Sequence, residues 1–148
     1  MLTVAYVGFG NSVIRYHLPF IKNNKNVHVK TIFRREEDRL LPGEKERELL
    51  YPDLLFTSDF NVVLKDPSIN LVSINTHVDV HYEYAKKALE AGKNVLLEKP
   101  FTNTLEEAKS LFKLAEEKGL IISCNNNRRY DADMQTLKKV LDSGVLGE

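Results

Sequence analysis

The sequence has little cysteine, no surplus of charge of either sign, and no long hydrophobic run. Cys124 is the one cysteine among 148 residues, which excludes an internal disulfide and suits a reducing compartment. Lys and Arg number 21, and so do Asp and Glu, so the net charge of zero gives no support for binding to nucleic acid or a membrane surface. No apolar run approaches the roughly 20 residues of a membrane span, and the first residues lack the basic start and apolar segment of a signal peptide. We therefore expect a soluble, cytoplasmic protein.

What the sequence does contain is an alternation of short apolar runs with longer segments of helical period. At 43% hydrophobic and 28% charged residues, the composition fits one globular domain with a sizeable core. Several runs are nearly continuous in apolar character, as expected for strands covered on both faces of a sheet. The predicted strands are Leu2–Val7, Val27–Phe33, Leu54–Phe56, Leu71–Asn75, Asn94–Leu97 and Leu120–Cys124.

Two helices are predicted from their period and their ends. Val80–Glu90 has apolar residues at helical spacing and stops before Gly92, which can take the left-handed position after a helix. Leu105–Lys118 repeats this plan, and Thr104 and Glu107 before and within it have the spacing of a capping box.

This alternation predicts the fold class, an α/β Rossmann-type, doubly wound parallel sheet with helices on both faces. Residues 1–124 would form this dinucleotide-binding domain. The charged segment 36–53, which has two prolines, is expected to be irregular and to lie on the surface. Ligands of such sheets bind beyond the carboxyl ends of the strands, so we expect function in the loops that follow them.

The loop after the first strand reads GFGNSV, from Gly8 to Val13. Glycine at the first position permits a tight turn, and Gly10 lets backbone amides approach a pyrophosphate at a helix N-terminus. The usual third Gly or Ala is Val13 here, so the helix is expected to pack slightly farther from the strand. The loop predicts a nucleotide-binding turn, with a plain strand–helix turn as the alternative.

Two arginines, Arg34 and Arg35, follow the second strand. An acidic residue at this point would bind the ribose 2′-hydroxyl of NAD, whereas an arginine accommodates the 2′-phosphate of NADP. A guanidinium group fits a phosphate in a bidentate way. We expect Arg34, with Arg35 behind it, to bind the 2′-phosphate, so that NADP is the cofactor and NAD the second choice. The pattern leaves open a solvated charge run, and leaves open that Glu36 or Glu37 reaches the ribose instead.

The loop after the fourth strand contains Thr76 and His77. His77 and His81 are four residues apart, but no third ligand at helical spacing converges with them, so we expect no metal. Thr76 and His77 are expected to line a cofactor cleft.

Lys99 follows the fifth strand, at the edge of the sheet where ligands bind. A lysine held there could polarise or protonate a substrate oxygen, because its pKa falls readily when it is partly desolvated. An ordinary exposed lysine, with Pro100 ending the strand, is the alternative.

With these loops in place, the sequence resembles the N-terminal half of the Gfo/Idh/MocA oxidoreductase family along its whole length. The motifs that carry the resemblance are VAYVGFGNS, ALEAGKNVLLEKPFT and NNRRYD, while RYHLPF and TIFRRE resemble a subgroup of bacterial oxidoreductases with poorly defined substrates. The resemblance implies an NAD(P)-dependent hydride transfer between the nicotinamide and an alcohol or ketone carbon of a sugar- or polyol-like substrate. A nucleotide-binding regulatory or sensor module is the alternative, but it would have no need of a proton-handling lysine beside the nicotinamide.

The resemblance also implies roles for individual residues. Lys99 would be the catalytic residue, joined to Pro100 by a cis peptide bond, and Glu98 would lie close to the nicotinamide ribose. The cofactor-binding residues that we expect are Gly8, Phe9, Gly10, Asn11, Ser12, Arg34, Arg35, Thr76, His77, Glu98, Asn127 and Arg128.

Family members have a second half, an antiparallel sheet that shapes the substrate pocket and supplies a further catalytic residue. Residues 125–148 are therefore expected to be a loop and a helix, Asp131–Ser143, that lead to a C-terminal domain missing from this chain, which would be a fragment or a truncated product. We expect such a chain to bind cofactor without turning over substrate alone. Because relatives often associate through the second half, we expect this chain to be monomeric and the full-length protein to form homo-oligomers.

Overall fold

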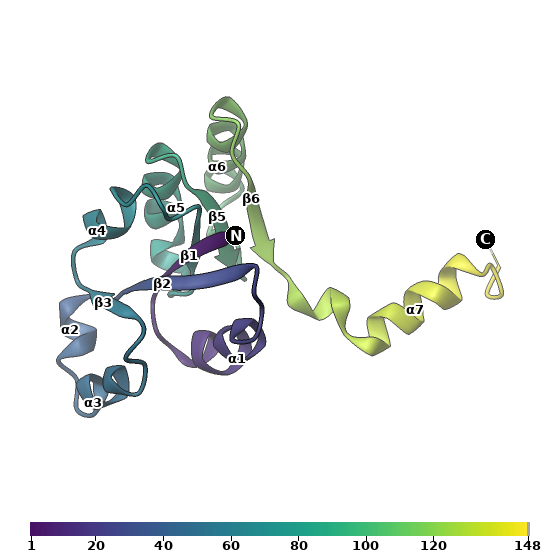
Figure 1. The fold of residues 1–148 in the computed structure, drawn as a ribbon. Helices are drawn as coiled ribbons and strands as arrows, with labels where there is room; N and C mark the ends of the chain where they lie inside the picture. Colours follow the sequence, from purple (N-terminus) through teal and green to yellow (C-terminus); the bar gives the residue numbers. More distant parts are fainter. Residues whose placement is uncertain (148) are drawn as a thin grey trace.

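A computed structural model describes residues 1–147, which form one six-stranded sheet (Figure 1). All its strand pairs are parallel, in the order β3-β2-β1-β4-β5-β6, so the direction of winding reverses between β1 and β4. This confirms the predicted doubly wound Rossmann-type fold. The strands are β1 (Leu2–Val7), β2 (Val27–Phe33), β3 (Leu55–Thr57), β4 (Leu71–Ile74), β5 (Asn94–Glu98) and β6 (Ile122–Asn125).

Helices cover both faces of the sheet, because successive strand residues point to opposite faces and apolar side chains occur on both. Ala5 and Val7 of β1 belong to a core cluster with α4, α5 and α6, whereas Val4 and Tyr6 belong to a second cluster with η1 and α1. The helices are η1 (Val13–His17, a π-helix), α1 (Leu18–Ile21), α2 (Glu36–Arg39), α3 (Glu44–Leu49), α4 (Phe60–Leu64), η2 (Val78–Val80), α5 (His81–Glu90), α6 (Leu105–Glu117), η3 (Asn127–Tyr130) and α7 (Ala132–Asp142).

The predicted helix ends are confirmed to within one residue. The Thr104 hydroxyl accepts a hydrogen bond from the Glu107 amide, and the Glu107 carboxylate accepts one from the Thr104 amide, which completes the capping box of α6. Gly92 follows α5 with φ of 77°, in the left-handed region.

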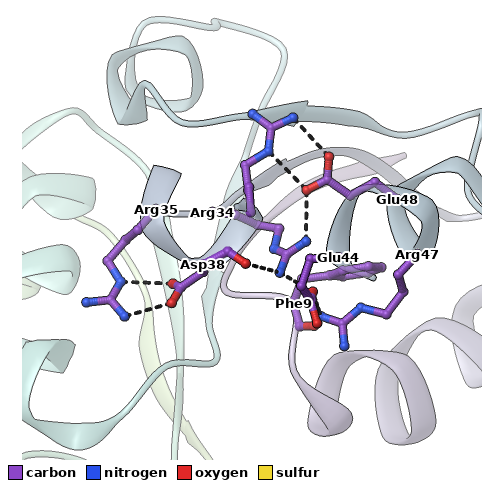
Figure 2. A network of polar contacts seen from close by, with 8 residues as sticks. Phe9, Arg34, Arg35, Asp38, Glu44, Arg47 and Glu48 are labelled. Carbon is purple, nitrogen blue, oxygen red and sulfur yellow. Dashed lines mark hydrogen bonds and ion pairs between the residues drawn. The ribbon is translucent and has the colours of Figure 1, made fainter. Parts of the chain in front are cut away.

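The prediction that segment 36–53 is irregular was wrong for residues 36–39 and 44–49, which form α2 and α3, whereas residues 40–43 and 50–53 lie outside helices and strands. Its charges are not all solvated: Glu48 of α3 is buried and pairs with Arg34 at 2.8 Å and with Arg39 at 2.9 Å. These ion pairs hold two short helices against the end of β2 (Figure 2).

The C-terminal helix α7 projects away from the sheet (Figure 1). Its apolar residues Met134, Leu137 and Leu141 are 44%, 48% and 59% exposed. The helix predicted over Asp131–Ser143 is thus present, and within residues 1–147 part of its apolar face is exposed. Among residues 1–147, no helix is long and apolar enough to cross a membrane.

Candidate functional site at the carboxyl edge of the sheet

The loop after β1 has one glycine that the fold requires and one that faces open space. Gly8 has φ of 97°, and a Cβ atom there would lie 2.6 Å from the carbonyl oxygen of Asn75. A side chain at this position would push β1 and β4 apart at the point where the winding reverses. A Cβ atom added to Gly10 would meet no atom of the described chain within 4 Å. Packing within residues 1–147 therefore does not require this second glycine, and the space beside it can take a ligand.

A helical segment over residues 11–21 begins directly after the glycines. The amide of Ile14 donates to the carbonyl of Gly10 at 3.2 Å, so the amides before it form the unsatisfied first turn of the segment. Such a turn favours an anion. Val13 is fully buried where a third glycine or alanine was expected, and the π-helix η1 turns His17 inward beside it.

The loops after β1, β2 and β4 border an open cavity of about 510 Å³. This volume lies in the usual range for small-molecule sites. Seven of the residues predicted to bind the cofactor line this cavity, namely Gly8, Phe9, Gly10, Arg34, Arg35, Thr76 and His77.

The same cavity is also lined by residues that the sequence did not point to. Glu44 and Arg47 reach it from α3, Asp38 reaches it from α2, and Asp79 reaches it from η2. Because segment 36–53 was expected to be irregular, the sequence analysis did not predict that side chains of α3 lie at the carboxyl edge of the sheet.

Arg34 is buried within this site, with an exposed fraction of 5%. Its Nη1 donates to the Glu48 carboxylate at 2.8 Å, and its Nη2 contacts the Glu44 carboxylate and the Asp38 carbonyl oxygen (Figure 2). Both terminal nitrogens are thus hydrogen-bonded inside the protein. Arg34 holds α2 and α3 against the end of β2, and its edge forms part of the cavity wall.

Arg35 is the more open of the two arginines, with a side chain that is 53% exposed. It donates from Nε and Nη2 to the Asp38 carboxylate at 2.9 and 3.0 Å. Exposed ion pairs contribute only about 0–1 kcal/mol, so an incoming anion can replace Asp38. The sequence predicted Arg34 as the main phosphate-binding residue with Arg35 in support, whereas in the structure Arg35 is the accessible one of the two. Neither Glu36 nor Glu37 is among the described residues that line the cavity.

Arg47 ties α3 to the glycine loop. Its Nη2 donates to the Phe9 carbonyl oxygen at 2.8 Å, and its guanidinium lies 5.2 Å from the centre of the Phe9 ring. The Phe9 ring is only 3% exposed and packs edge-on against Tyr51 and Phe56. Phe9 therefore anchors the loop in the core while its backbone faces the cavity.

A second polar cluster surrounds Glu98 at the end of β5. One carboxylate oxygen lies 3.1 Å from His17 Nε2, 2.6 Å from Asn125 Nδ2 and 3.4 Å from Asn75 Nδ2. The other oxygen accepts the Lys99 amide at 3.2 Å. Burial raises the pKa of Glu98, but the hydrogen bonds from His17, Asn125 and the Lys99 amide outweigh burial, so its pKa lies below its ordinary value. Glu98 is therefore a fixed anion at neutral pH.

His17 was not among the predicted site residues of this cluster, and neither were Asn75 and Asn125. With Glu98 ionised, Nε2 carries the ring proton, and Nδ1 accepts from the Tyr6 hydroxyl at 3.3 Å. Burial raises the pKa of Tyr6 above its ordinary range, which keeps this hydroxyl protonated. A signal was present in the sequence, because His17 falls four residues after the apolar Val13, on the buried face of the helix.

Lys99 is exposed beside this cluster, and the Lys99–Pro100 peptide bond is cis, which confirms that expectation. Asn127 and Arg128 lie on η3, where Arg128 is exposed and pairs with Asp131 at 3.1 Å. The 510 Å³ cavity contains none of Asn11, Ser12, Glu98, Lys99, Asn127 and Arg128. A second cavity of about 570 Å³, between α1 and the chain after α3, contains none of the predicted residues.

The two histidines after β4 lie in different surroundings. His77 lines the cavity, whereas His81 is fully buried, with its ring nitrogens 3.1 Å from the carbonyl oxygens of Thr76 and Pro100. Among residues 1–147, no group of three His, Cys, Asp or Glu residues is arranged to hold a metal ion. His81 instead joins the loop after β4 to the cis-proline loop after β5.

The chain is similar to oxidoreductases over its whole length. Residues 2–126 match the family model described as an oxidoreductase family with an NAD-binding Rossmann fold. An uncharacterized oxidoreductase of Escherichia coli strain K12, YhhX, is 50% identical over 100% of this chain and 42% of its own length. The NADP(+)-dependent scyllo-inositol 2-dehydrogenase IolW of Bacillus subtilis strain 168 is 32% identical over 98% of this chain and 38% of its own.

Solved structures agree with this similarity. An oxidoreductase from Bacillus cereus superposes with a TM-score of 0.88 at 42% identity, over 100% of this chain and 41% of that one. The 3-ketoreductase KijD10 from Actinomadura kijaniata, solved as a mutant with TDP-benzene and NADP, gives a TM-score of 0.85 at 27% identity, over 99% of this chain and 44% of that one. The chain thus spans about two fifths of the length of these relatives. From its strand order, its glycine turn and these matches, the chain belongs to the Gfo/Idh/MocA oxidoreductase family and contains the NAD-binding Rossmann fold of that family.

Proposed function

We propose that this chain is the cofactor-binding half of an NADP-dependent oxidoreductase that acts on an alcohol or ketone carbon of a sugar- or polyol-like substrate. The observation that carries the proposal is the cavity at the point where the winding reverses, open beside Gly10 and lined by Arg35. The residues present fit a dinucleotide, because the turn after β1 offers free amides to a pyrophosphate and the cavity has room for an adenosine. Two relatives have names that indicate dehydrogenation of an inositol and reduction of a ketone, which supports the substrate class.

The nicotinamide half would extend toward β5, where Glu98 and Lys99 lie. When bound, the cofactor supplies or accepts the hydride. Glu98 is held as an anion by donors from three elements and would fix the ribose at this end. Lys99 is exposed, and among residues 1–147 its Nζ has no hydrogen-bond partner, so it is free to donate a proton to a substrate oxygen.

We assign the 2′-phosphate first to Arg35 and second to Arg34. Arg35 can exchange the Asp38 carboxylate for phosphate at little cost, since both pairs are charge-assisted and the existing one is exposed. Hydrogen bonds to a charged group contribute about 1.5–3 kcal/mol, which corresponds to roughly a tenfold to hundredfold preference. Arg34 is already paired with two carboxylates, so it would stabilise the wall of the cavity and would not bind the phosphate by itself.

A titration of the chain with NADPH and with NADH, followed by nicotinamide fluorescence, tests this function. We expect both to bind and NADPH to bind more tightly. Arg35→Ala should weaken NADPH by about tenfold to hundredfold and leave NADH nearly unchanged. Lys113→Ala is a matched control, because Lys113 is an exposed, ion-paired cation on α6, outside the cavity.

The titration separates the parts of the proposal. If neither dinucleotide binds, the oxidoreductase assignment of this site is wrong. If both bind equally, or if Arg35→Ala leaves their ratio unchanged, the cofactor is not selected by its 2′-phosphate at Arg35.

A further inference from the structure

The cavity beside the glycine loop carries no net charge, although it is expected to take a phosphorylated ribose. A phosphate monoester brings about two negative charges at neutral pH. Such an anion is favoured only where one of the acids in the wall moves or is absent. The charged residues that line the cavity are Arg34, Arg35 and Arg47, and Asp38, Glu44 and Asp79.

Glu44 differs from the other two acids because it bridges two arginines. The same carboxylate oxygen contacts Nη2 of Arg34 and Nη2 of Arg47 (Figure 2). The bridge joins a buried arginine at the end of β2 to a partly exposed one on α3, with exposed side-chain fractions of 4% and 32%. Two guanidinium groups around one oxyanion are the arrangement that proteins use to bind a phosphate. The Glu44 carboxylate thus lies between two guanidinium groups, at a position that a bound phosphate could otherwise take.

Arg47 has donor capacity that the fold leaves unused. Its Nε is buried and, among residues 1–147, has no hydrogen-bond partner. Its Nη2 already bonds the carbonyl of Phe9, which lies between the two glycines of the turn. An unsatisfied buried donor is costly, so an additional acceptor at this point would be favoured.

We propose that Glu44 sets how strongly this chain prefers nicotinamide dinucleotides that carry a 2′-phosphate, by occupying the anion position between Arg34 and Arg47. This inference rests on the proposed binding of a dinucleotide in the cavity. With the Glu44 carboxylate in place, a 2′-phosphate meets Arg35 and is repelled by Glu44. With the charge of Glu44 removed, Arg34 and Arg47 become phosphate donors as well.

The test is isothermal titration of the chain with adenosine 2′,5′-bisphosphate and with ADP, which differ at the ribose 2′ position. Glu44→Gln should tighten the bisphosphate about tenfold, as one additional charge-assisted pair requires, and should leave ADP nearly unchanged. Glu46→Gln is the matched control, because Glu46 is an exposed acid of the same helix and does not line the cavity.

A second variant identifies the arginine that Glu44 masks. Arg47→Gln alone should change the ratio of the two dissociation constants little, because Arg47 is already paired. In the Glu44→Gln background, the same substitution should abolish most of the gain in bisphosphate affinity. Melting curves verify that each variant is folded, and Glu44→Ala provides the same test if the glutamine variant does not fold.

The outcomes distinguish the two proposals. If the unmodified chain binds neither nucleotide, the proposed function fails. If it binds both, but Glu44→Gln behaves like Glu46→Gln, the role of Glu44 is overturned and the proposed function stands. If Glu44→Gln tightens the bisphosphate with or without Arg47, then Glu44 sets the preference and Arg47 is not the group that it masks.

Discussion

The two polar clusters at the carboxyl edge of the sheet use charge in different ways. Around Glu98, one anion is surrounded by side-chain donors from His17 and Asn125 and by a backbone amide, with no second carboxylate among its contacts in the described part of the chain, so the carboxylate has one stable arrangement. Around Arg34, three guanidinium groups alternate with the two carboxylates of Glu44 and Glu48, so each ion pair has a competing partner nearby (Figure 2). Under the proposed function, the first cluster would hold the nicotinamide end of the cofactor in a fixed geometry. The second would discriminate between cofactors, because a bound anion can replace one of the acids.

The largest effect that we expect comes from breaking the buried part of the second cluster. Arg34→Ala should lower the free energy of unfolding by about 3–5 kcal/mol, because it leaves the buried Glu48 carboxylate and the bridging Glu44 without this cation. Arg35→Ala should lower it by only about 0–1 kcal/mol, because its ion pairs are exposed. Urea denaturation of the two variants provides the measurement. Equal stabilities would show that the burial of Arg34 does not distinguish the two arginines.

A smaller effect, which depends on pH, is expected in the first cluster. His17→Phe removes a donor from Glu98 and leaves the buried Tyr6 hydroxyl without this partner, and should cost about 1–3 kcal/mol at neutral pH. Because the folded-state pKa of Glu98 is lowered, its ionised form stabilises the fold above the unfolded-state pKa of about 4.3. That contribution is lost as the pH falls through the folded-state pKa.

As the pH falls from about 7 to about 3, the His17→Phe variant should therefore lose less stability than the unmodified chain. The reason is that one cause of the lowered pKa of Glu98 is gone. Glu98→Gln should remove the same acid-dependent term entirely. His28→Phe, the same exchange at an exposed histidine, is the control. An unchanged acid dependence in both His17→Phe and Glu98→Gln would mean that this cluster does not hold Glu98 ionised.

The two clusters also differ in how far they could be predicted. The glycine turn and the cap of α6 depend on residues within a few positions of one another, and local rules located them correctly. The cis Lys99–Pro100 bond was expected from the family resemblance alone, and the structure confirms it. The pairing of Arg34 with Glu44 and Glu48 joins residues 10 and 14 positions apart across a segment with no clear period. His17 meets Glu98 across 81 positions. Such contacts depend on the packing of the whole fold. The residue pattern therefore predicted that Arg34 lies at the end of β2, but it could not predict that Arg34 is buried.

The central claim is that a dinucleotide lies along the carboxyl edge, with its adenosine at the arginine cluster and its nicotinamide at the Glu98 cluster. Amide chemical shifts of the ¹⁵N-labelled chain, recorded with adenosine 2′,5′-bisphosphate and then with NADP⁺, test it most directly. The bisphosphate should shift Gly10, Arg35 and Thr76, and NADP⁺ should in addition shift Glu98 and Lys99. Absence of shifts at these residues, or shifts confined to the second cavity near Val27 and Tyr51, would contradict the claim.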